Sequence, residues 1–68
     1  MEWTRVFNSN QPVLAELIKN QLENENIPVA LVNKIDSAYS ILGEVELWVP
    51  IDYVIRAIYI INLWKDEK

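Results

Sequence analysis

The residues of this chain that could do chemistry are mostly carboxylates, and two of them lie close together in one strand-like segment. Residues 44–50 read Glu-Val-Glu-Leu-Trp-Val-Pro, an alternation that predicts a β-strand. Glu44 and Glu46 then share one face, where two carboxylates could bind a hard cation or share a proton. Cross-strand pairing with Arg5 or Lys34, or plain solvation, is the commoner role of such residues, and we favour it here.

Nucleophilic and metal-dependent chemistry lacks its usual residues. The 68 residues include no His and no Cys, and Gly43 is the only glycine. The chain therefore has no imidazole base, no thiolate and no glycine-rich phosphate loop. Ser9, Ser37 and Ser40 have no His to activate them, and helix capping or loop solvation explains them. We expect a protein that is not an enzyme and that carries no cofactor and no metal.

Length and charge narrow the class further. A chain of this length forms one small domain, residues 1–68. The formal net charge of −4 argues against nucleic acid and against an anionic membrane surface as partners. No apolar run reaches the roughly 18 residues of a membrane span, and residues 1–6 do not resemble a signal peptide. These features favour a cytoplasmic protein.

Hydrophobic patterns predict five elements to support these residues. Residues 3–8 and 27–33 read as strands on either side of a helix that opens at Pro12 and ends near Asn24. Asn26 can adopt the left-handed conformation that ends such a helix. A second helix follows the strand of residues 44–50, and Asp52 is a suitable N-cap for it.

The order of these elements predicts an α+β fold. A right-handed crossover from the first strand leaves a gap that the third strand fills, giving the sheet order 1-3-2 with both helices on one face. This β-α-β-β-α arrangement is a truncated ferredoxin-like, split βαβ fold. The core would come from aliphatic residues of the third strand and of both helices. They are Val45, Leu47 and Val49, facing Leu14, Ile18, Ile58 and Ile61.

The face of the sheet away from the helices has no further layer to cover it. Strict alternation places Trp3 and Phe7 on this outer face with Val32 and Trp48, and Val6 on the core side. The last helix carries a second apolar stripe that includes Ile55 and Tyr59, although surface helices are apolar on one side only. We interpret these six aromatic and aliphatic residues as an interface, and we favour a homo-oligomer, a dimer or trimer, over another protein or a ligand.

Several segments also resemble a known family. They are Pro12 with Ala15-Glu16, Leu22-Glu23, Ile27-Pro28-Val29, the run from Gly43 to Pro50, Asp52 and Ala57. Across residues 11–61 the chain is similar to short bacterial proteins described as putative prokaryotic signal transducing proteins, with Asn26 where the family usually has glycine. The resemblance implies a PII-like fold with a ferredoxin-like core that associates, and it implies no catalytic residues.

The segment of residues 34–43 is the remaining candidate for contacts with a ligand or a partner. In PII-like proteins the corresponding loops contact ligands and partners, which makes Asp36, Ser37, Tyr39 and Ser40 candidate contacts, although a plain hairpin connection also explains this segment. Taken together, the sequence predicts a non-catalytic interaction module, for self-association or protein binding, in signal transduction. The alternative is a regulatory subunit that binds a small molecule between protomers.

Overall fold

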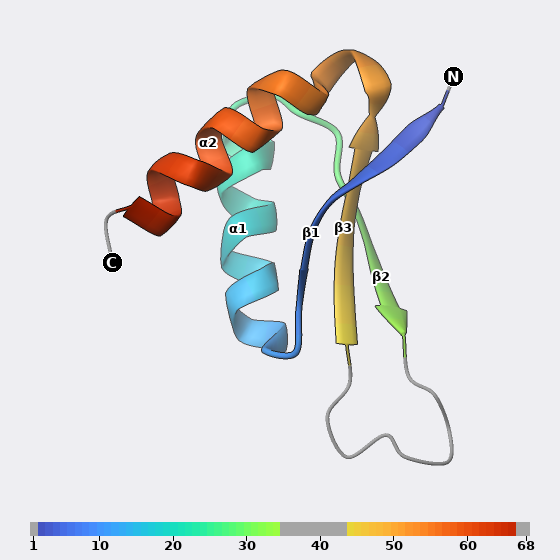
Figure 1. The fold of residues 1–68 in the computed structure, drawn as a ribbon, viewed down its shortest axis with the longest axis vertical. Coiled ribbons are helices and arrows are strands. Elements are labelled where there is room, and N and C mark those ends of the chain that lie inside the picture. Colours follow the sequence, from blue (N-terminus) through green and yellow to red (C-terminus); the bar gives the residue numbers. More distant parts are fainter. Residues whose placement is uncertain (1, 35–43, 67–68) are drawn as a thin grey trace.

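The computed structural model describes residues 2–34 and 44–66, with the side chains of residues 34, 65 and 66 left out. The elements follow the order β-α-β-β-α. They are β1 (Trp3–Ser9), α1 (Pro12–Asn24), β2 (Ala30–Lys34), β3 (Glu44–Pro50), a 3₁₀ turn (Ile51–Tyr53) and α2 (Val54–Asp66). The sheet has the order β1-β3-β2 with antiparallel pairing throughout. Both helices lie on one side of it (Figure 1), so the predicted α+β fold and strand order are confirmed.

The passage from α1 into β2 follows from local chemistry. Pro12 opens α1 as predicted, because a proline at the first helical position loses no hydrogen bond. At the other end Asn26 has a φ of 65°, the left-handed geometry that ends many helices. The N–H of Ile27 donates to the carbonyl of Leu22, which turns the chain towards the sheet. β2 begins only at Ala30, three residues later than predicted.

β3 is the central strand, and its odd-numbered residues form the middle of the core. Val45, Leu47 and Val49 are buried against the helices, as predicted from their alternation. The other buried apolar residues come from α1, α2 and the turn before β2. They are Ala15, Ile18, Leu22, Ile27, Ala57 and Ile61. Within the described ranges, neither helix has the length and apolar character needed to cross a membrane.

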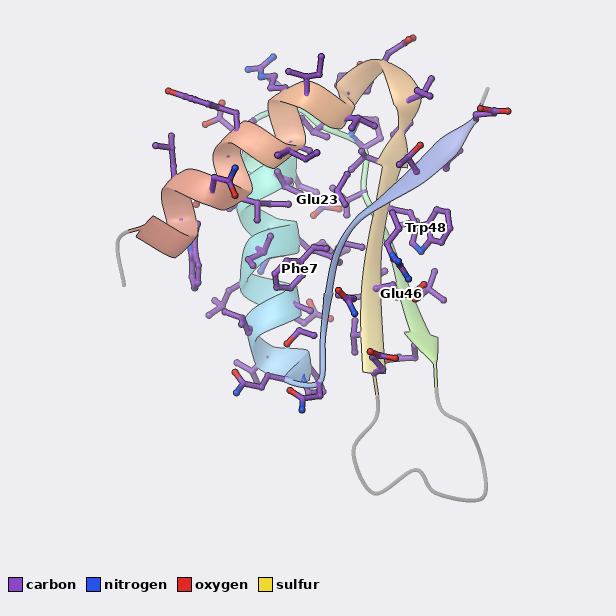
Figure 2. The ribbon with its side chains drawn as sticks, viewed as in Figure 1. Phe7, Glu23, Glu46 and Trp48 are labelled. Carbon is purple, nitrogen blue, oxygen red and sulfur yellow. The ribbon has the colours of Figure 1, made fainter. Side chains whose placement is uncertain are left out.

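A β-bulge in β1 makes the predicted face of Phe7 wrong. Arg5 pairs with Trp48 and Phe7 pairs with Leu47, so two steps on β1 match one step on β3. The extra residue shifts the alternation. Phe7 therefore packs against the core cluster together with Val6, and Figure 2 shows its ring directed towards α1. Phe7 is removed from the candidate outer-face interface, whereas the core-side placement of Val6 is confirmed.

The start and rotation of α2 also differ from the prediction. The 3₁₀ turn begins directly after Pro50, so Asp52 lies inside the first turn and is not the N-cap. Ile58, expected to meet β3, is 42% exposed, whereas Ile60 packs against the core cluster. The buried side of α2 runs through Ala57 and Ile61. Because α2 has aliphatic residues on every side, its periodicity alone could not select this one.

Candidate interaction surfaces

The outer face of the sheet is built by the even-numbered residues of β3 and their neighbours. Trp48 pairs with Arg5 on one side and with Ala30 on the other, while Val32 lies opposite Glu46. Directly paired residues share a face of the sheet, so these side chains project away from the helices. Figure 2 shows Trp48 on the side of the sheet opposite α1 and α2, which confirms its predicted orientation.

At the centre of this face lies a buried carboxylate. Glu46 is only 2% exposed. Its Oε2 accepts a hydrogen bond of 3.0 Å from Nη1 of Arg5 in an ion pair, and its Oε1 accepts one of 3.0 Å from the indole Nε1 of Trp48. A buried charge is tolerated where it is paired and hydrogen-bonded. Glu46 therefore holds an arginine and a tryptophan side by side on the outer face.

The two candidate carboxylates serve different partners. The predicted cross-strand pairing of Glu46 with Arg5 is confirmed. Glu44 instead accepts a hydrogen bond of 3.3 Å from Nδ2 of Asn8, in an exposed position. Among the described residues, no three acidic side chains gather closely enough to hold a metal ion. What the strands position here is a buried carboxylate with an arginine and a tryptophan bonded to it.

The predicted interface residues divide into two separate groups. Trp3 and Val32 are exposed on the outer face beside the half-buried Trp48. Ile55 and Tyr59 are exposed on α2, in the other layer of the fold. The candidate loop residues fall outside the described part of the chain. They are Asp36, Ser37, Tyr39 and Ser40.

Comparison with known protein families gives one match. The model of the family described as putative prokaryotic signal transducing protein matches residues 3–65. The chain belongs to this family. Searches of curated proteins and of solved structures found no significant match. This description suggests signal transduction without establishing it, and it names neither a ligand nor a partner.

One of the segments that carry the family resemblance also positions the outer face. The run from Glu44 to Pro50 is β3 itself, which supplies Glu46 and Trp48. Asn26, where the resemblance implies a glycine, holds a positive φ. The resemblance therefore coincides with the central strand and with the turn that leads α1 back to the sheet.

A shallow hollow lies between the two helices of this family member, and the sequence analysis missed it. Its volume is about 340 Å³, and it is lined by Gln21 of α1, by Glu25 directly after α1, and by Ile60, Leu63 and Trp64 of α2. Glu25 also accepts a hydrogen bond of 3.4 Å from Nη2 of Arg56, which links the helices beside it. The i, i+4 apolar spacing on α2 was visible in the sequence, but the crossing of the two helices was not.

Proposed function

We propose that this family member is a non-catalytic interaction module in signal transduction, and that its outer sheet face binds a partner protein. The observation that carries the proposal is the arrangement of Arg5 and Trp48 around the buried carboxylate of Glu46. Arginine and tryptophan are the residue types most enriched at interface hot spots. Holding them in place before binding reduces the conformational entropy that binding costs.

The side chains of this face also indicate the chemistry of the partner. The Arg5 side chain is 53% exposed although its Nη1 contacts Glu46, so its guanidinium can also meet a carboxylate of the partner. Trp3 and Val32 are exposed next to it and offer apolar area. The partner should therefore present an acidic side chain next to apolar ones.

A photocrosslinker placed on this face tests the proposal. Benzoylphenylalanine at Val32 would sample the outer face, and the same group at Val13 would be the matched control, because Val13 is exposed on α1. Crosslinking is performed in the cells that produce the protein. We expect a protein captured from position 32 and not from position 13. The purified partner must then bind the parent chain directly in calorimetry.

Two substitutions decide whether that binding uses the outer face. Trp3→Ser should weaken the affinity by about tenfold or more. A tryptophan at an interface contributes up to several kcal/mol of binding free energy, and a loss of about 1.4 kcal/mol already weakens the affinity tenfold. Ile55→Ser, on α2, should leave the affinity unchanged. Equal capture at positions 32 and 13, or full affinity of Trp3→Ser, contradicts the proposal.

A regulatory subunit that binds a small molecule is the second candidate function. The hollow between α1 and α2 favours it, since its volume lies near the lower limit for small-ligand sites, about 300 Å³. A thermal-shift screen with nucleotides and metabolites separates the two functions. A ligand of the native state would raise the melting temperature, and Leu63→Ser, in the wall of the hollow, should abolish that increase.

A further inference from the structure

Helix α2 carries a second apolar row on the side opposite its buried residues. The row consists of Ile55, Tyr59 and Leu63, continued by Ile51 in the 3₁₀ turn. All four are exposed, Ile55 by 85% and Tyr59 by 63%. A helix that is apolar on two opposite sides is expected to be covered on both.

The spacing of this row makes it complementary to itself. Its residues are four apart and lie symmetrically about position 57. In an antiparallel, two-fold pairing of α2 with a second α2, Ile55 therefore meets the partner's Tyr59, and Ile51 meets the partner's Leu63. Rows of this spacing are the ridges that interdigitate when two helices cross at about −50°. The antiparallel sense also places each helix N-terminus near the partner's C-terminus, which the helix dipoles favour.

The two ends of the row have different surroundings. Leu63 borders the hollow between α1 and α2, and Ile51, at the opposite end, is exposed. The antiparallel pairing brings the partner's Ile51 to this hollow. The same symmetry places the exposed Asp52 opposite the partner's Asn62, so that an amide can donate to the carboxylate.

We propose that the row Ile51, Ile55, Tyr59 and Leu63 binds a second copy of this chain, as an antiparallel, two-fold α2 pair. The contact is smaller than the roughly 800 Å² per partner of a standard interface, so the dimer is weak. The row faces away from the core, on the side of α2 opposite Ala57 and Ile61. The dimer therefore leaves the outer sheet face free, and this inference does not depend on the proposed function.

Disulfide trapping tests the pairing directly, because the chain contains no cysteine. Two single variants, Ile55→Cys and Tyr59→Cys, are made and mixed under mild oxidation. The antiparallel pairing predicts that the mixed 55–59 disulfide forms at least about tenfold faster than either homodisulfide, well above the twofold excess of random pairing, since it joins opposed positions whose backbones approach closely. A mixed disulfide that forms no more than about twice as fast as each homodisulfide, the result of random pairing, overturns the proposal, as do faster homodisulfides.

Sedimentation equilibrium measures the association itself. The parent chain should show a rising average mass up to about 0.5 mM, the range of a weak dimer. Ile55→Ser should weaken dimerisation by about tenfold or more, since it removes a buried apolar side chain from both copies. Val13→Ser removes an equally exposed aliphatic residue from α1, with Val13 73% exposed, and should change nothing. A parent chain that stays monomeric, or equal effects of the two substitutions, overturns the proposal.

Discussion

The indole Nε1 of Trp48 donates a hydrogen bond of 3.0 Å to Oε1 of Glu46, two residues earlier on β3. Residues two apart on a strand share a face, so this hydrogen bond draws the side chain of Trp48 along the sheet surface towards Glu46. Trp48 and Arg5 together bury the carboxylate of Glu46 on the face of the sheet that carries no helix. The outer face is therefore ordered by contacts among its own side chains.

Removing Arg5 should cost more stability than removing Arg56. The two arginine side chains are similarly exposed, 53% and 59%, but Arg5 pairs with the buried Glu46 and Arg56 with the partly exposed Glu25. Arg5→Ala should lower the free energy of unfolding by about 1–3 kcal/mol, because a buried carboxylate loses a charged partner. Arg56→Ala should cost less than about 1 kcal/mol. Urea unfolding followed by tryptophan fluorescence measures both, and equal costs would contradict the role assigned to Glu46.

The bulge in β1 predicts opposite consequences for its two aromatic residues. Phe7 packs against the core cluster, whereas Trp3 is exposed on the outer face. Phe7→Ala should lower the free energy of unfolding by about 2–4 kcal/mol, somewhat less than for a fully buried ring. Trp3→Ala should cost less than about 1 kcal/mol, a typical value for a surface position. Strict alternation along β1 would instead place both rings on one face, and similar costs in thermal unfolding would support that arrangement.

Much of the fold could be predicted because the residues that start and end the elements agree with the rule that places the strands in the sheet. Pro12 marks the start of α1, Asn26 supports its end, and the alternation of residues 44–50 sets which side of β3 meets the helices. The right-handed crossover then leaves one place for β3 in the sheet. The Arg5–Glu46 pair was one of the pairings that this order allows, because β1 and β3 are neighbours, but it also depends on the register that places Arg5 beside Trp48.

The remaining features depend on geometry that a single sequence does not encode locally. No residue type in β1 indicates the bulge, because the formation of a bulge depends on how the paired strands twist. The side of α2 that faces the core is set by its crossing with α1 and by the 3₁₀ turn before it, and so Ile58 was placed wrongly. That Glu46 and Trp48 lie on the same face of the sheet was predictable from their spacing, but the direction of the indole N–H was not.

The left-handed conformation of Asn26 makes this position sensitive to the size of its side chain. With a φ of 65°, Asn26→Gly should be neutral or stabilising by up to about 1 kcal/mol, since glycine adopts this region without strain. Asn26→Ala should cost about 1–2 kcal/mol. Asn24→Ala is the control, because Asn24 is exposed at the end of α1 and alanine favours helix there. Thermal unfolding distinguishes these outcomes, and an unchanged Asn26→Ala would contradict the assigned geometry.

The two proposed surfaces should respond to salt in opposite directions. Each copy carries a formal charge of −4, so two copies repel, and the α2 row that joins them is apolar. Raising NaCl from about 50 to 500 mM shortens the screening length and should strengthen dimerisation by a few-fold. Binding of an acidic partner through Arg5 relies on charge attraction and should weaken over the same range. Sedimentation and calorimetry at both salt concentrations measure the two effects, and a dimer that weakens with salt would mean that ion pairs, not the apolar row, hold it together.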